Sequence, residues 1–246
     1  MINGTIKQIE EDDNSEYNRE QMYWADLKSF EGVPYTLYGI NDELDNLSKL
    51  IEVIGESVLA QEKDFKEISS EEEAIQNSFP TDKMIDNWHK KNYRSFSYKA
   101  LLTVIHSDFE MALKDLFKIL TEAKRINFKI KNDKLMDILK DFKALDNSLD
   151  PLILKAWPFN FIRNKVIHSN GYFVKTDKGY VEFERFIKDR VDIEVKQLPS
   201  TNSEFTHRVI IKQSSLLKDY IQLIREIISS LLKAAHNANY VEPAGS

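Results

Sequence analysis

The sequence predicts a mainly α-helical bundle with a small antiparallel β insertion before its last helix. Two observations support this fold class. Apolar residues recur at intervals of three and four through most of the chain, which is typical of helices with one buried face. Between residues 172 and 211 the interval becomes two, which is typical of half-buried strands. The 246 residues suffice for one large domain.

Composition is that of a soluble globular protein, with 42% hydrophobic and 30% charged residues. No apolar run approaches the roughly 20 residues that span a bilayer. The chain has no cysteine, which excludes disulfides and thiolate metal sites. The N-terminus is polar and acidic, unlike a secretory signal. We therefore expect a cytoplasmic protein without membrane contact.

Residues 1–40 are expected to form a polar leader and one short helix near residues 23–30. Gly32, Pro34 and Gly39 should break that helix. Asn41 or Asp42 could then cap the next helix. The apolar positions of this next helix are spaced by three, four, three and four residues: Leu44, Leu47, Ile51, Ile54 and Val58.

The strongest helical pattern lies in the middle of the chain. Thr81-Asp82 indicates a helix start, and a long core helix with a wide apolar face follows over residues 98–120. A shorter helix is expected over 135–142, followed by a connector over 146–151. The final helix should run from about Gln213 to Ala235. We expect residues 41–240 to form one domain and 241–246 a disordered tail.

Three or four antiparallel strands are expected in the insertion at about 172–211. The run Thr176-Asp177-Lys178-Gly179 is typical of a hairpin turn. It would join a strand at 172–174 to a strand at Val181–Phe183. Apolar and polar residues also alternate over 191–195 and 205–211.

The stretch from Phe161 to Phe173 holds the best candidates for chemistry. Arg163 is followed directly by Asn164, and His168 comes five positions after the arginine. Asn170-Gly171 is a helix-stop signal, so His168 should lie in the last helical turn, where the helix dipole favours a cation by roughly 0.3–1 kcal/mol. Imidazole is suited to acid–base chemistry near neutral pH.

The helix carrying these residues is expected to begin near Pro158, which suits a first helical turn. On an ideal helix Arg163 lies within an apolar stripe, where its charge needs a partner or water. Asn164 and His168 share a different side. Arg163 and His168 can therefore meet only if the helix end distorts, or if a second copy of the helix supplies the missing groups across a two-fold axis.

The arrangement Arg-Asn-x3-His at a helix end resembles the signature of the HEPN superfamily of ribonucleases. The resemblance covers residues 163–168, with a compatible helical layout over about 95–236. It implies a HEPN-like helical bundle that dimerises and cleaves RNA without metal or cofactor. The 2′-hydroxyl would attack the adjacent phosphate, leaving a 2′,3′-cyclic phosphate and a 5′-hydroxyl.

The resemblance also implies residue roles. His168 would be the general acid or base, Arg163 would hold the scissile phosphate, and Asn164 would orient the imidazole or phosphate. Glu110, on the long core helix, could assist as an acid. A local basic island over 151–176 contains Lys155, Arg163, Lys165 and Lys175 and no acidic residue, although the net charge is −6. It suggests substrate contacts from Lys155, Lys165 and Tyr172.

The expected partners are RNA, a second copy of the chain that completes the site, and an antitoxin or other regulator. HEPN toxins that are controlled by adenylylation often carry a tyrosine two residues after the histidine. Asn170 stands there, and the nearest tyrosine is Tyr172, which argues against that form of control. A toxin or antiviral defence effector is the expected role.

Three other interpretations stay open. The chain could be a non-catalytic HEPN-like module that dimerises or docks on a partner. It could be a helical regulator that binds a small molecule near the basic island. Arg163 and His168 could also be structural, with the arginine snorkelling or paired to a carboxylate. His106 and Glu110 lie four residues apart and are expected to border the apolar face of the core helix; two ligands without a third do not indicate a metal site.

Overall fold

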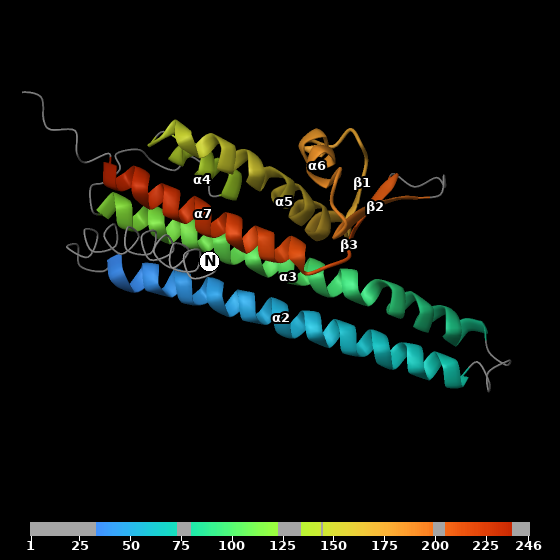
Figure 1. Cartoon of the computed structure of the whole chain (residues 1–246). Helices are drawn as coiled ribbons and strands as arrows, with labels where there is room; N and C mark the ends of the chain where they lie inside the picture. Colours follow the sequence, from blue (N-terminus) through green and yellow to red (C-terminus); the bar gives the residue numbers. More distant parts are fainter. Residues whose placement is uncertain (1–32, 73–79, 123–133, 144, 199–204, 238–246) are drawn as a thin grey trace, which may run out of the picture. The chain divides into compact units, whose positions relative to one another are not determined.

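The structure is a computed structural model that describes residues 33–72, 80–122, 134–143, 145–198 and 205–237. These residues form a mainly α-helical protein with one small antiparallel sheet, as predicted (Figure 1). The expected short helix near 23–30 and the expected tail at 241–246 lie outside the described residues. The helices and strands are α2 (Val33–Glu72), α3 (Pro80–Glu122), α4 (Leu135–Phe142), α5 (Asp150–Ser169), β1 (Tyr172–Phe173), α6 (Tyr180–Ile187), β2 (Ile193–Gln197), β3 (His207–Ile211) and α7 (Ser215–Asn237).

The chain divides into two compact units. Unit 1 comprises Met1–Glu43, Glu110–Ile153 and Ile224–Ser246, and unit 2 comprises Leu44–Phe109 and Leu154–Leu223. In unit 1 the apolar faces of α3, α4 and α7 are buried, and Phe117 meets Phe142 edge-on with ring centroids 5.9 Å apart. All the motif residues from 163 to 168 belong to unit 2.

The core of unit 2 combines helices with the sheet. From α2 and α3 it takes Leu44, Leu47, Ile51, Val58, Leu101, Leu102, Ile105 and Phe109. From the other elements it takes Phe159, Phe161, Ile162, Phe173, Phe183, Val209, Ile211 and Tyr220. Glu62 on α2 makes a bidentate ion pair with Arg94 on α3, in which Arg94 Nε lies 2.6 Å from Oε1.

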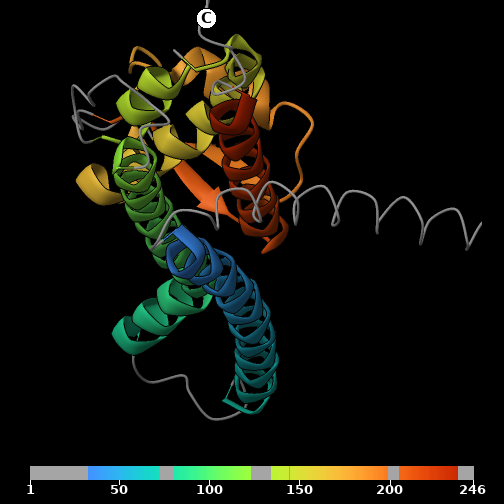
Figure 2. The same cartoon turned by 90° about the vertical axis from the view of Figure 1, so that its left-hand side faces the viewer.

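The sheet has the strand order β1-β3-β2, and both pairings are antiparallel. In the register, Tyr172 opposes Arg208 and Ile193 opposes Ile211. The sheet and α6 lie together at the C-terminal end of α5 (Figure 1). Figure 2 shows the strands beside α3, where the Ile211 amide donates to Ser95 Oγ at 3.1 Å. The predicted insertion at 172–211 is therefore confirmed as a small antiparallel sheet.

The predicted hairpin at 176–179 is wrong, because Val181–Phe183 begin a helix rather than a strand. The Asp177 carboxylate accepts from the Val174 amide at 2.9 Å, and Gly179 follows with a left-handed φ of 88°. Tyr180 and Phe183 are buried three residues apart, whereas Val181 is 53% exposed. A spacing of three places both rings on one helical face, so α6 buries both of them.

Two predicted helix boundaries are also wrong. The break at 32–39 and a start at Asn41 or Asp42 are replaced by a helix that begins at Val33, so the proposed domain boundary at 40/41 falls inside α2. Pro34 fits there because the first turn needs no amide donor. Gly39 costs only about 1 kcal/mol in a helix.

Pro158, expected in a first turn, lies inside α5, which already begins at Asp150 within the expected connector. A proline there costs about 3 kcal/mol. Burial of the neighbouring Ala156, Phe159 and Ile162 offsets this cost. The predicted helices over 98–120 and 135–142 are confirmed as parts of α3 and α4, and the final helix is confirmed as α7, which begins at Ser215 rather than at about Gln213.

Candidate functional site

The end of α5 matches the predicted helix exit. The helix ends at Ser169, and Asn170 and Gly171 follow with left-handed φ values of 51° and 86°. The Gly171 amide donates to the Lys165 carbonyl at 2.7 Å. Ser169 Oγ lies 3.0 Å from that carbonyl and 2.5 Å from the carbonyl of Tyr172. This network fixes the turn that leads from the motif helix into β1.

His168 lies in the last turn of α5, as predicted, and its side chain is exposed. Within the described part of the chain, no hydrogen bond or ion pair engages its imidazole. Solvent and any ligand at this surface can therefore reach the ring. The negative end of the helix dipole also lies in this turn.

Arg163, by contrast, is half-buried and turned into the fold. One terminal nitrogen, Nη1, donates to Asn164 Oδ1 at 3.0 Å, and the buried Nε has no hydrogen-bond partner in the structure. No carboxylate on the residues that the structure describes forms an ion pair with this guanidinium. The guanidinium thus has a neutral amide as its hydrogen-bond partner, and no carboxylate of the described residues neutralises its charge.

The positive charge of Arg163 acts on His106 of α3. His106 is 1% exposed, and its Nδ1 lies 2.7 Å from the hydroxyl of Tyr220 on α7. Burial, and then the positive charge of Arg163, lower the pKa of His106 to about 3. His106 is therefore neutral at physiological pH. The prediction that it borders the apolar face is wrong, because Tyr220 supplies the partner that allows burial.

Aromatic rings fix this buried pair. Phe159, four residues before Arg163 on α5, stacks on Tyr220 with centroids 4.2 Å apart and planes 7° apart. Phe109 meets the same ring edge-on at 6.3 Å. The polar atoms of His106 and Tyr220 are thereby held in one arrangement beside Arg163.

One chain does not assemble the motif dyad. Arg163 and His168 are separated by five residues, or about 140° around an ideal helix. The structure has Arg163 beside the buried His106 and His168 at the surface. This agrees with the geometry expected for one helix. The composite site across a two-fold axis stays a prediction.

The basic island is smaller than the sequence window suggested. Lys165 pairs with Asp177 at 2.8 Å, just beyond that window, and lies 5.5 Å from the Phe161 ring centroid. Burial raises the pKa of Asp177, but the hydrogen bonds from Lys165 and Val174 outweigh it and lower the pKa overall. Lys165 is thus already neutralised by a carboxylate.

The other predicted site residues are dispersed. Lys155 is exposed on α5, and Glu110 pairs with Lys114 at 2.8 Å. Tyr172 is half-buried, and the guanidinium of Arg208 lies over its ring at 5.1 Å from the centroid. Lys175 is exposed and lies 5.9 Å from the Tyr180 centroid.

Sequence reasoning missed two further cations beneath the end of α5. Lys99 on α3 is only 3% exposed, and its Nζ donates to the Asn170 carbonyl at 3.2 Å. Burial, and then the charge of Arg208, lower its pKa to about 8. Arg208 on β3 donates from Nη1 to Asn92 Oδ1 at 3.0 Å. The available signal was a lysine next to the buried Tyr98 and two residues before Leu101.

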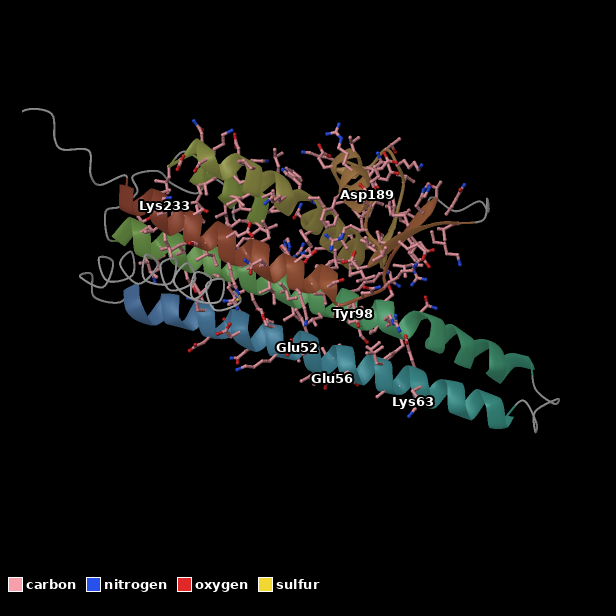
Figure 3. All side chains as sticks on the ribbon, viewed as in Figure 1. Glu52, Glu56, Lys63, Tyr98, Asp189 and Lys233 are labelled. Atoms are coloured by element: carbon pink, nitrogen blue, oxygen red, sulfur yellow. The ribbon has the colours of Figure 1, made fainter. Side chains whose placement is uncertain are left out.

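A hollow of about 400 Å³ lies elsewhere in unit 2, between α2, α3 and the segment entering α7. Glu52, Glu56 and Tyr98, which border it, are labelled in Figure 3. Its cations are already engaged: Arg94 with Glu62, Lys212 with Glu194 and Lys218 with Glu52. It therefore offers a mixed polar surface whose cations are already paired.

Among the described residues, no group of three or more acidic or histidine side chains could hold a metal ion. None of the helices in the described ranges is both long and apolar enough to cross a membrane. Comparison with protein-family models, curated proteins and solved structures returned no match.

Proposed function

We propose that the chain is a metal-independent endoribonuclease of the HEPN type, acting as a toxin or antiviral defence effector in the cytoplasm. The observation that carries the proposal is the state of Arg163. This cation is half-buried, held by Asn164, and not paired with a carboxylate on the described residues. A phosphate is the type of group that such a guanidinium binds well.

Exposure of His168 supports the second part of the proposal. In the proposed reaction, one His168 removes the proton of the ribose 2′-hydroxyl. The 2′-oxygen then bonds to the adjacent phosphorus, and the bond to the 5′-oxygen breaks. The leaving oxygen takes a proton from His168 of the other copy or, more slowly, from water. Arg163 stabilises the charge on the phosphoryl oxygens.

The products are a 2′,3′-cyclic phosphate and a 5′-hydroxyl, and no water is consumed in this step. Because one chain presents Arg163 and His168 on different sides of α5, the site needs two copies of the helix. A homodimer with the site at its two-fold axis meets that need. RNA is the substrate, and an antitoxin or other regulator would restrain the activity in the cell.

The proposal is tested by incubating the purified protein with mixed RNA in excess EDTA and sequencing the ends. Cleavage with cyclic-phosphate ends is expected, and His168→Ala and Arg163→Ala should each lose at least about a hundredfold in rate. Arg185→Ala, which removes an exposed cation from α6, is the matched control. Cleavage that requires added metal, or that survives both motif substitutions, would reject the proposal.

One observation favours a second candidate, a non-catalytic dimerisation module. The charge of Arg163 acts on the buried His106, as an architectural cation would. In that case Arg163→Ala should weaken dimerisation or folding, as measured by sedimentation and thermal denaturation, while no RNA is cut by the wild-type protein. RNA cleavage that His168→Ala abolishes without changing the sedimentation coefficient decides for the enzyme.

A further inference from the structure

Lys99 and Arg208 form a cation pair that the motif does not explain. Lys99 comes from α3 and Arg208 from β3, and the charge of Arg208 lowers the pKa of the Lys99 ammonium. Two like charges in a partly buried place repel each other because little water screens them. An anion between or beside the two cations would relieve that repulsion.

No carboxylate of the described residues takes that role. Lys99 has one polar partner, the Asn170 carbonyl, and Arg208 has the amide oxygen of Asn92 and the face of Tyr172. These groups carry partial charges only, so the two positive charges are not neutralised. The buried Nε of Arg208 has no hydrogen-bond partner among the residues that the structure describes. The ammonium of Lys99 has three N–H donors and uses one.

The backbone is shaped to admit Lys99 at this place. A Cβ atom on Gly171 would lie 2.6 Å from Lys99 Nζ, so only glycine allows this approach without displacing the lysine. The Gly171 carbonyl accepts from the Val209 amide at 2.9 Å, which links the turn to the strand that carries Arg208. The turn after α5 therefore holds both cations in a fixed relation.

We propose that Lys99 and Arg208 together bind one phosphate group at the C-terminal end of α5. The two side chains supply the charge, and the unused N–H donors of both supply the hydrogen bonds. Tyr172 holds the guanidinium plane from one side and Asn92 anchors Nη1. Asn170, which accepts from Lys99, follows His168 by two residues. Neither cation belongs to the motif, so the site can exist whether or not the chain cleaves RNA.

The phosphate can come from an RNA backbone or from a small phosphorylated molecule, and two probes separate these sources. The first probe is inorganic phosphate, compared with chloride at equal ionic strength, with the melting temperature of the whole chain as readout. The second is a labelled single-stranded oligoribonucleotide, bound to His168→Ala protein in EDTA, with fluorescence anisotropy as readout. Substituting His168 keeps cleavage from affecting the second readout.

For the wild-type cation pair we expect phosphate to raise the melting temperature. Arg208→Gln should weaken phosphate binding about ten- to a hundredfold, as expected for losing hydrogen bonds from a charged group. Arg208→Lys keeps the charge but has fewer N–H donors, so its phosphate affinity should lie between those of the wild type and Arg208→Gln. Lys188→Gln removes an exposed charge at the end of α6 and is the matched control. It should bind phosphate like the wild type.

A parallel loss of oligonucleotide affinity in Arg208→Gln would identify the RNA backbone as the source. Loss of phosphate binding with unchanged oligonucleotide affinity would identify a small phosphorylated molecule. The proposal is overturned if folded Arg208→Gln and Arg208→Lys bind both probes as the wild type does, or if phosphate acts no differently from chloride. Cleavage assays decide the proposed function separately, because they follow His168 and Arg163.

Discussion

Arg163 shows at the scale of single residues why a sequence pattern can locate chemistry without giving its surroundings. The cation, its Asn164 neighbour and the surface histidine follow from the motif and helix periodicity. The charge of Arg163 acts on His106, which lies 57 positions earlier in the chain, on α3. The hydrogen-bond partner of His106, Tyr220, lies 57 positions after Arg163. Periodicity describes one helix at a time, so it does not reveal such contacts between helices.

Buried His106 predicts an acid-sensitive fold. Burial, and then the charge of Arg163, lower its pKa from an ordinary value of 6.5 to about 3 in the folded protein, so the unfolded chain binds a proton first as the pH falls. Its contribution to stability is complete above pH 6.5 and declines below it by up to about 1.4 kcal/mol per pH unit until the folded pKa is reached. Urea unfolding at pH 7, 6, 5 and 4 should show this decline.

Comparison of variants isolates the contribution of His106, since acidic residues also titrate in that range. His106→Gln should unfold with a shallower pH dependence than wild type between pH 6.5 and 4. His168→Gln, which removes an exposed histidine, should keep the wild-type slope. Parallel slopes for wild type and His106→Gln would show that the imidazole is not kept neutral by burial.

At the scale of elements, replacing glycine by alanine is expected to have opposite effects on stability at two positions. Gly171→Ala should destabilise the protein by at least about 1–2 kcal/mol, because φ is +86° there and the new methyl group would displace Lys99. Gly39→Ala should stabilise it by about 0.5–1 kcal/mol, because Gly39 is inside α2 with open space around it. Denaturant midpoints measure both; a loss of stability at Gly39 would count against the helix there.

The elements also show what local sequence can and cannot specify. Apolar spacing was sufficient for α3, α4, α7 and the strands β2 and β3. It failed at α6, where Val181 and Phe183 alternate as in a strand while Tyr180 and Phe183 fit a helix equally well. The choice is made by burial against Phe161 and Phe173, whose centroids lie 4.7 and 6.0 Å from that of Phe183. Tertiary packing therefore overrides an ambiguous pattern.

Helix boundaries failed for a related reason. Pro158 is a strong local signal, yet α5 continues through it because its neighbours are buried on both sides. Local penalties of about 1–3 kcal/mol are smaller than the free energy of burying several large side chains. Propensity rules locate breaks well only where the flanking residues have nothing to pack against.

For the whole molecule, the proposed two-fold site predicts complementation between inactive variants. Arg163→Ala and His168→Ala should each be inactive as pure proteins. After mixing with subunit exchange, mixed dimers carry one intact arginine and one intact histidine on opposite copies, so cleavage of RNA should return in part. Random exchange of equal amounts makes about half of the dimers mixed. Arg185→Ala mixed with His168→Ala controls for simple dilution.

Continued inactivity of the mixture would place the two groups in separate sites, even if each dimer forms. The experiment thus tests the shared cleft directly, which single substitutions do not. Sedimentation of the mixture verifies that exchange has occurred before the cleavage rate is interpreted.

The chain passes between its two compact units after residues 43, 109, 153 and 223. Four helices of the described residues, α2, α3, α5 and α7, are continuous across such a passage. No single cut can release either unit as an unbroken polypeptide. Unwinding a shared helix in one unit also removes backbone hydrogen bonds that continue into the other. Neither unit can therefore be excised as one segment and fused to another domain. Changes to this protein, natural or engineered, must be substitutions or surface insertions.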